Sequence, residues 1–256
     1  MDFTIEQKRL IRAVNKSFGI EATSSDYISR SKHLYDALKQ MDLVVAGGAI
    51  TSVFNNRKVN DLDMYFRSEV DTAALDKLLS AFGFELKFTS PTATTFVRKG
   101  KGPSKFYVQA VMAFKGPPSQ IFSTFDFTVC CGAYSFRDEA FELHPRFLPD
   151  NVTKRLVYLG GSRFPLCALY RVKKYSLKGY TISGGALVHI GLCASRLEIT
   201  TYADLKMHLR GVDTYFLGNF LESKPDDLPC NVSEVIDEIF PKLEEMHADG
   251  TISEPL

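Results

Sequence analysis

The sequence has few cysteines, and their spacing matches neither a disulfide framework nor a metal site. There are five, an odd number scattered along the chain: Cys130, Cys131, Cys167, Cys193 and Cys230. This arrangement argues against a disulfide framework and favours a reducing compartment. Two adjacent cysteines without a histidine at finger spacing are poor zinc ligands, which excludes a structural zinc site. The five histidines likewise follow no metal or catalytic-triad spacing.

Long apolar runs and a strong net charge are also absent. No apolar run approaches about 18 residues, so we expect no membrane-spanning segment. The N-terminus is acidic and amphipathic, which predicts no signal peptide and a cytoplasmic protein. With 31 Lys and Arg against 30 Asp and Glu the net charge is +1, so any nucleic-acid contact must come from local clusters. Walker, dinucleotide and Gly-x-Ser-x-Gly fingerprints are missing, which leaves hydrolase and dehydrogenase functions without support.

The 256 residues, 45% of them hydrophobic, are enough for one large domain or two modest ones. Periodicity predicts helices over 4–18 and 25–41, then a sheet-containing part, then helical segments after Pro149. The predicted domains are N-terminal helices over 1–42, a catalytic unit over 43–149 and a helical region over 150–256. Within them we expect a strand over 122–134 and helices over 151–159 and 232–247, among others.

Two aspartates lie two positions apart in the segment from Asp61 to Phe66, where acidic and apolar residues alternate. This alternation predicts a β-strand with Asp61, Asp63 and Tyr65 on one face. Carboxylates at i and i+2 of a strand point the same way and can hold divalent cations, and hard oxygen ligands select Mg²⁺ or Mn²⁺ over zinc. Mg²⁺ normally completes its shell with water and substrate phosphates. The pair therefore predicts a phosphate-bearing partner.

A glycine pair precedes these aspartates. Gly47 and Gly48 follow the apolar run from Leu43 to Ala46, which predicts a buried strand, and they precede a short helix. Glycine lets a phosphate approach the backbone, and a helix start offers free N–H groups to it. A strand, Gly-Gly, a helix and an Asp-Leu-Asp strand together are more specific than either motif alone.

A third carboxylate is expected at Asp126, which stands between Phe125 and Phe127 in the predicted strand over 122–134. An ionised aspartate in such an apolar segment is costly unless it meets a cation. The alternative is that Asp126 caps a neighbouring backbone group or lies on a solvated face.

These residues carry a resemblance to a known family. The segment GGAITSVFNNRKVNDLDMYF resembles the nucleotide-binding signature of the polymerase β nucleotidyltransferase superfamily. PLCALYRVKKYSLKGYTI, from Pro165 to Ile182, is similar to the helix that links head and neck in CCA-adding enzymes and bacterial poly(A) polymerases. The stretch from KFYVQAV to FDFTVCCGAY is similar to small phage nucleotidyltransferase-like proteins. The resemblance covers about residues 43 to 182 and implies an α+β fold, a mixed β-sheet flanked by helices and followed by a smaller helical region.

The resemblance also implies an activity. Asp61, Asp63 and Asp126 would hold two Mg²⁺ or Mn²⁺ ions and catalyse transfer of NMP from an NTP, such as ATP, to an acceptor hydroxyl with release of pyrophosphate. The nucleotide-binding candidates are Gly47, Gly48, Thr51, Ser52, Arg171 and Lys174. For the two cations, a solvated helix face is an equal alternative.

The acceptor stays open. The leading hypothesis is an RNA 3′ end, with tRNA as one candidate; a protein side chain or small molecule, as in nucleotidyltransferase toxins, is the second. A catalytically silent nucleotide-binding protein is the third, and the presence of all three carboxylates argues against it. A phage-encoded chain would act in the host cytoplasm.

Two further segments are basic. Arg57 and Lys58, shortly before Asp61, are candidates for acceptor phosphate, against the alternative that loop charges keep the protein soluble. KGKGPSK, from Lys99 to Lys105, predicts an exposed hairpin tip, with nucleic-acid contact as the alternative.

Overall fold

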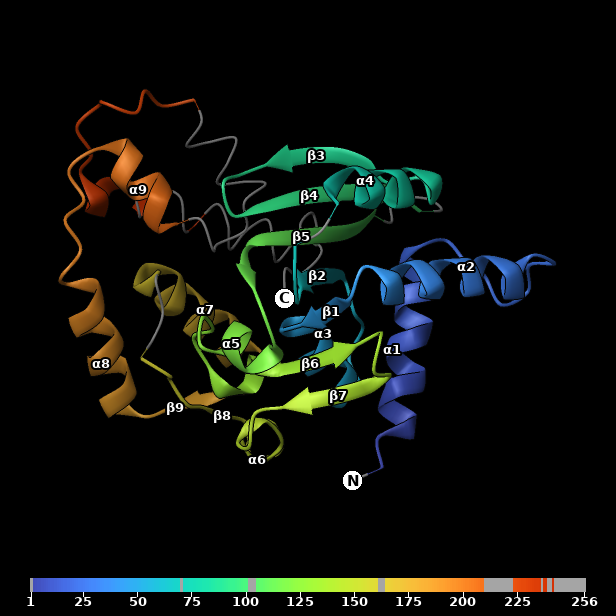
Figure 1. Cartoon of the computed structure of the whole chain (residues 1–256). Helices are drawn as coiled ribbons and strands as arrows, with labels where there is room; N and C mark the ends of the chain where they lie inside the picture. Colours follow the sequence, from blue (N-terminus) through green and yellow to red (C-terminus); the bar gives the residue numbers. More distant parts are fainter. Residues whose placement is uncertain are drawn as a thin grey trace. The chain divides into compact units, whose positions relative to one another are not determined.

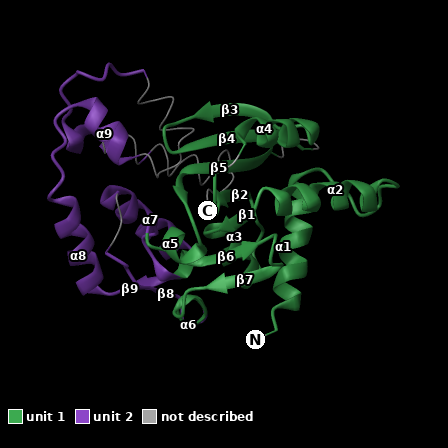
Figure 2. Ribbon diagram, viewed as in Figure 1, with its two compact units in different colours: residues 1–123, 129–151, 256 green, residues 124–128, 152–255 purple. Residues whose placement is uncertain are grey.

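The computed structural model describes residues 2–69, 71–100, 105–160, 164–209, 223–235, 237–238 and 241. The chain divides into two compact units (Figure 2). The first contains Met1–Ser123 and Val129–Asn151, and the second contains Thr124–Thr128 and Val152–Pro255. The chain therefore passes between the units after Ser123, after Thr128 and after Asn151. The predicted domain limits stay a prediction.

The first unit is built on a seven-stranded sheet (Figure 1). In spatial order its strands are β3 (Glu85–Thr89), β4 (Ala93–Lys99), β5 (Lys105–Lys115), β2 (Asp61–Phe66), β1 (Leu43–Ala46), β6 (Gly132–Ser135) and β7 (Ala140–Leu143). β2 and β5 run parallel, whereas the other neighbouring pairs in this sheet are antiparallel. The sheet is therefore mixed, and the predicted α+β class is confirmed.

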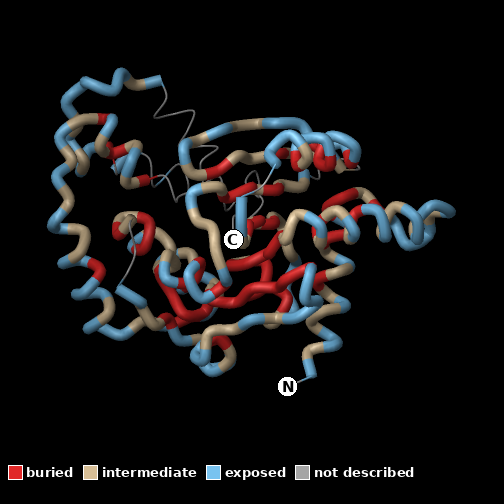
Figure 3. Tube along the Cα trace, in the orientation of Figure 1, coloured by how far each residue is buried: buried red, intermediate tan, exposed pale blue. Residues whose placement is uncertain are grey.

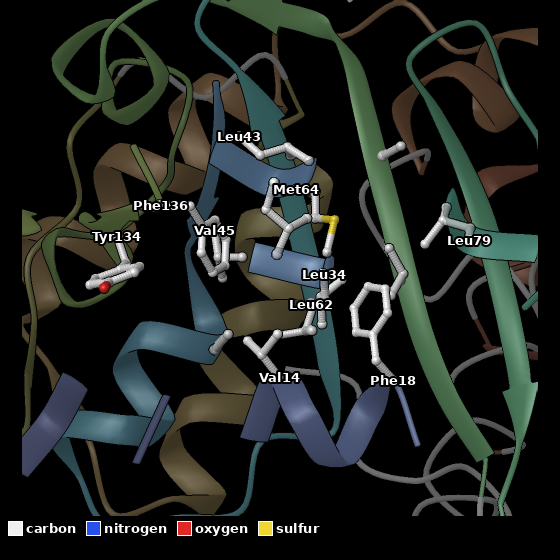
Figure 4. Packing of buried hydrophobic residues seen from close by; sticks show 14 of the residues in the cluster. Val14, Phe18, Leu34, Leu43, Val45, Leu62, Met64, Leu79, Tyr134 and Phe136 are labelled. Carbon is white, nitrogen blue, oxygen red and sulfur yellow. The ribbon is translucent and has the colours of Figure 1, made fainter. Parts of the chain in front are cut away.

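Four helices pack on one face of this sheet. They are α1 (Thr4–Ser17), α2 (Tyr27–Gln40), α3 (Gly48–Phe54) and α4 (Thr72–Ala81). Figure 4 shows Val14 of α1 and Phe18, which follows this helix, near Leu62 of β2, and all three belong to one buried cluster with Met64. Every second residue of β2 points into this cluster, because side chains alternate between the faces of a strand. Burial of these apolar side chains, drawn red along the central strands in Figure 3, is the main stabilising term of the unit.

Short elements complete the first unit. α5 (Pro118–Phe122) packs on β5 and β6, α6 (Phe147–Val152) follows β7, and the 3₁₀ turn η1 (Thr128–Cys130) leads into β6. No disulfide joins the five cysteines, all of which are described.

The second unit is mostly helical. Its described helices are α7 (Pro165–Leu177), α8 (Gly184–Ala194) and α9 (Tyr202–His208), and β8 (Arg155–Leu156) pairs in parallel with β9 (Thr181–Ile182). Its own small core gathers Cys167 of α7 with Leu205 of α9. None of the helices in the described ranges is both long and apolar enough to cross a membrane.

Two predicted elements are wrong. The strand expected over 122–134 is instead the end of α5, an irregular segment, η1 and the start of β6, and Phe127 forms only an isolated bridge with Tyr158. The helix expected over 151–159 is replaced by the end of α6 and by β8. Both segments satisfy their backbone groups through residues distant in sequence, as when Thr181 donates to the carbonyl of Lys154. The tip of the KGKGPSK hairpin and most of the helix expected over 232–247 lie outside the described residues.

Candidate nucleotide and metal site

Asp61 and Asp63 lie on β2, and the predicted strand with its alternation is confirmed. Leu62 and Met64 are fully buried under the helices, whereas Asp61 and Asp63 are half-buried on the opposite face. Their Cα atoms are separated by two strand residues, roughly 6–7 Å. The two carboxylates therefore share one face of the sheet, with Oδ1 of Asp61 buried.

The glycine turn lies at the end of β1 that adjoins the start of β2. Ala46, the last residue of β1, pairs with Asp63, so Gly47 follows next to the first residues of β2. Gly47 has φ 81°, a conformation that favours glycine. Its carbonyl accepts from the N–H groups of Ile50 and Thr51 and so begins α3, while its own N–H donates to the carbonyl of Gly132 over 3.0 Å. The N–H of Gly47 is thus already engaged, and Gly48 and Ala49 occupy the first turn of α3, where N–H groups lack an intrahelical acceptor.

Gly132 supports this turn, and sequence reasoning missed it. A Cβ atom there would lie 2.8 Å from Ile50 Cγ2 and 2.8 Å from Phe147 Cε2. Only glycine lets β6 approach α3 this closely, because real Cβ atoms do not tolerate such contacts. The available signal was a glycine at the start of an apolar strand, which marks a close approach as often as a turn.

Thr51 and Ser52 are buried within α3. The hydroxyl of Thr51 donates to the carbonyl of Val129 over 2.8 Å, with the carbonyl of Gly47 as a second acceptor at 3.2 Å. This bond ties α3 to the segment before β6, a structural role that the sequence did not indicate. The predicted contact of both residues with phosphates stays a prediction.

Polar residues of neighbouring strands flank the aspartates. In the parallel ladder Asp61 pairs with Tyr107 and Asp63 with Gln109, and Gln109 pairs with Thr95 on β4. Paired residues share a face of the sheet, so this face carries carboxylate, amide and hydroxyl oxygen atoms side by side. Sequence reasoning missed Gln109, because the pairing of β2 with β5 joins residues 46 positions apart.

Asp126 belongs to the second unit, where it forms an ion pair with Arg171 of α7. The Asp126 side chain is 3% exposed and that of Arg171 33%. The structure thus brings two predicted site residues together, and they pair with each other. The cation that a buried aspartate requires is supplied here by the chain itself.

Tyr158 lies near this ion pair. Lys174 lies one turn beyond Arg171 in α7, and residues three apart share a helix face. Burial, together with the nearby Cys193 thiol and Asp126 carboxylate, raises the pKa of Tyr158 to about 12. Its hydroxyl therefore stays protonated at neutral pH and can act as a hydrogen-bond donor.

The predicted metal ligands fall in different units, Asp61 and Asp63 in the first and Asp126 in the second. Within the described ranges, no three His, Cys, Asp or Glu side chains gather closely enough to hold a metal ion. The two carboxylates of β2 and the Asp126–Arg171 pair are each described within their own unit.

Residues 16–154, more than half of the chain and including the glycine turn and all three aspartates, match the model of the Gabija anti-defense 2 protein family. The chain is also 38% identical over 216 residues to a curated relative, "Gabija anti-defense 2" of Bacillus phage SPbetaL7. The chain belongs to the Gabija anti-defense 2 family. The match covers 83% of this chain and 52% of the relative, so the chain spans about half the length of that family member.

Solved structures similar to this chain are tRNA-processing nucleotidyltransferases. A CCA-adding enzyme complexed with ATP is 16% identical with a TM-score of 0.53, covering 74% of this chain and 50% of its own. A tRNA nucleotidyltransferase with primer tRNA and an incoming ATP analog is 15% identical with a TM-score of 0.51, covering 69% and 55%. A Thermotoga maritima CCA-adding enzyme complexed with tRNA is also 15% identical with a TM-score of 0.51, covering 77% and 49%. These likenesses show the fold, and the predicted polymerase β-like nucleotidyltransferase fold is confirmed.

Proposed function

We propose that this chain is a metal-dependent, template-independent nucleotidyltransferase. The observation that carries the proposal is the meeting of the glycine turn and the Asp61–Asp63 pair at one sheet edge, through the pairing of Ala46 with Asp63. The nucleotidyltransferase fold supports the same reaction class, but fold alone does not fix function. The proposed acceptor is an RNA 3′ end, and protein or small-molecule acceptors are the alternative.

The residues around Asp61 and Asp63 fit a hard divalent cation. Carboxylates at i and i+2, with Gln109 beside Asp63, supply oxygen donors on one face of the sheet, which suits Mg²⁺ or Mn²⁺ with several waters retained. When bound, such an ion neutralises phosphate charge and lowers the pKa of an acceptor hydroxyl. Asp61 and Asp63 would hold the ion and fix its place at this edge.

The glycine turn would bind the phosphates of the NTP. With the N–H of Gly47 donated to Gly132, the amides of Gly48 and Ala49 are the groups available to phosphate oxygens. No side chain at Gly48 hinders the approach of phosphate to the backbone. Asp126 as the third carboxylate, and Arg171 and Lys174 as cations for the triphosphate, are part of the same proposal.

A transfer assay tests this directly. Purified protein with Mg²⁺ and each labelled NTP in turn is offered total RNA and total soluble protein. We expect label to enter an acceptor with wild-type protein and to fall at least about 100-fold in Asp61→Asn/Asp63→Asn, because the ion would lose its ligands. Asp76→Asn/Asp71→Asn, which removes two exposed acidic charges from α4 and its start, is the control and should transfer normally.

The acceptor that becomes labelled decides between the hypotheses. Label in RNA supports terminal transfer, and label in protein supports the toxin-like alternative. Nucleotide binding without transfer to any acceptor would contradict the enzymatic proposal and favour a silent binding protein.

We also propose that the chain counteracts the Gabija defence, as the name of its 38% identical relative states for that protein. In cells that carry a Gabija system and are infected by a phage which that system restricts, expression of this chain should increase plaque numbers. If the Asp61→Asn/Asp63→Asn variant does not increase plaque numbers, the anti-defence effect depends on the transfer chemistry. If the chain itself does not change plaque numbers, the anti-defence role is refuted.

A further inference from the structure

A basic pocket lies in the first unit on the helix-covered side of the sheet. It has a volume of about 250 Å³ and is lined by residues of α1, the end of α3, the following loop and β5. Five of the lining residues are cationic: Arg9, Arg12, Lys16, Arg57 and Lys58. Its described lining includes no aspartate or glutamate. The chain as a whole carries a net charge of only +1, so this is a strong local concentration of positive charge.

The cations of α1 form a row. Arg9, Arg12 and Lys16 lie at positions i, i+3 and i+7, which share one face of a helix. The row is about 10 Å long, from seven residues at 1.5 Å each. One phosphate can meet only part of such a row, whereas a chain of phosphates can meet all of it. Arg57 and Lys58 face the row from the loop after α3.

The floor of the pocket is apolar. Ala13, Val53 and Val59 line it, together with the half-buried ring of Phe106 at the start of β5. Positive charge around an aromatic floor is the combination with which proteins hold single-stranded nucleic acid, since phosphates meet the cations and a base stacks on the ring.

Arg98 of β4 fixes the end of α1 that lines the pocket. Its Nε donates to the carbonyl of Ser17 over 2.7 Å and one Nη to the carbonyl of Lys16 over 2.9 Å, which fixes the last turn of α1. Its guanidinium lies 4.7 Å from the centre of the Phe106 ring. One side chain therefore positions both the cationic row and the aromatic floor, so the pocket is built rather than formed by loose surface residues.

The pocket is distinct from the aspartate face. Val53 and Phe106 pack with Leu62 and the α1 residues in the main core, on the face of β2 opposite to Asp61 and Asp63. A strand bound here would lie on the other face of the sheet from the proposed reaction.

We propose that this pocket binds single-stranded RNA through its phosphates, with a base against its apolar floor, of which Phe106 is part. A free nucleotide shares this chemistry but is too short to meet the whole row. Binding here does not require nucleotidyl transfer, because neither the proposed metal ligands nor the residues proposed to bind the NTP phosphates take part.

Fluorescence anisotropy of the full chain tests the proposal without Mg²⁺. The probes are a labelled single-stranded 12-nucleotide RNA, labelled ATP and labelled polyglutamate. The pocket variant is Arg12→Gln/Lys16→Gln/Lys58→Gln, and the control is Lys8→Gln/Lys32→Gln/Lys77→Gln, which removes three exposed charges of the same unit outside the pocket. We expect the pocket variant to bind RNA at least about tenfold more weakly, with a salt slope reduced by roughly 2. The control should stay within about twofold of wild type, since no phosphate contact is lost.

Four results would overturn the proposal. One is the absence of RNA binding by wild type, and one is equal weakening by the pocket and control variants. Another is loss of ATP binding in the pocket variant while RNA binding stays intact, which would assign the pocket to a free nucleotide. The fourth is polyglutamate binding as tightly as RNA with the same dependence on the pocket, which would show mere charge attraction. Because transfer activity is measured separately, its failure would leave these outcomes unchanged.

Discussion

Gly132, beside the glycine turn, and the Asp126–Arg171 pair of the second unit have structural roles that their neighbours in the sequence do not indicate. Gly132 accepts the hydrogen bond of Gly47 and leaves room for Ile50 and Phe147. Asp126 and Arg171 compensate each other's charge in a largely buried pair. Gly132 supports the turn proposed to bind phosphates, and Asp126 and Arg171 are themselves proposed site residues, so structural and functional effects must be separated by experiment.

Gly132→Ala should destabilise the first unit by about 1–3 kcal/mol, because its Cβ has no space beside Ile50 and Phe147. Urea unfolding measures the loss. Gly191→Ala in α8, where a Cβ would meet nothing within 4 Å, is the matched control and should be neutral or stabilising by up to about 1 kcal/mol. Equal stability of Gly132→Ala and wild type would contradict the close approach of β6 to α3.

Arg171→Met should lower the free energy of unfolding by about 2–3 kcal/mol, because it leaves the buried Asp126 carboxylate without its cation. Asp126→Asn/Arg171→Met should recover most of this loss, since neither charge then remains. A double-mutant cycle by urea unfolding measures the coupling. Strictly additive effects would show that the pair does not stabilise the unit.

At the scale of elements, α9 illustrates a helix start defined by its own residues. Thr201 and Asp204 form a capping box, in which each side chain accepts from the other's backbone N–H. The Oδ2 atom of Asp204 accepts four hydrogen bonds, two from Thr200 and two from Thr201. These bonds, that from the Thr200 N–H foremost, lower the pKa of Asp204 to about 2. The charged form of this carboxylate is thus the one that stabilises the helix start.

This cap should make stability depend on pH in a defined window. The folded pKa lies below the unfolded one, so the contribution is complete above about pH 4 and is lost as the pH falls through about 2. The stability difference between wild type and Asp204→Asn should therefore shrink from pH 5 to pH 2. Urea unfolding at each pH measures it, and the exposed Asp76→Asn should show a smaller change. A constant difference across this range would contradict the proposed cap.

Local patterns predicted the elements that their own residues specify. β2 followed from the alternation of Asp61 to Phe66, and α7 from Pro165 and its helical spacing. The segment around Phe127 could not be predicted, because this side chain is fully buried by Tyr158 and Tyr175 rather than by strand neighbours. The Asp61–Asp63 pair was visible in sequence. Its neighbour Gln109, the Gly132 contact and the Asp126–Arg171 pair were not, because each depends on residues at least 45 positions away.

At the scale of the whole molecule, the part of the chain that the structure describes crosses between the units three times. The five residues Thr124–Thr128 belong to the second unit although residues on both sides of them belong to the first. Phe127, with no exposed surface, packs there on Tyr158 and Tyr175. A cut near the predicted boundary at Asp150 therefore separates Phe127 from its partners.

A fragment of residues 1–151 should consequently expose Phe127 and bind the dye ANS, which the full chain should bind weakly. Phe127→Ser in the fragment should reduce this signal, because a polar residue removes the exposed ring. The same substitution in the full chain should destabilise by about 3–5 kcal/mol, as core aromatic truncations do. ANS fluorescence and urea unfolding measure both effects. A fragment with no dye signal would show that Phe127 finds other cover.

The bond between Gly47 and Gly132 also has a consequence for how the protein is made. The two residues are 85 positions apart, so at about 5–20 residues per second a ribosome needs roughly 4–17 s to synthesise the second after the first. During that interval β1 cannot pair with β6, its neighbour on the side away from β2, because β6 has not yet been synthesised. Pairings of such long sequence separation fold slowly, and the turn that we propose for phosphates is therefore among the last parts of the first unit to mature on a nascent chain.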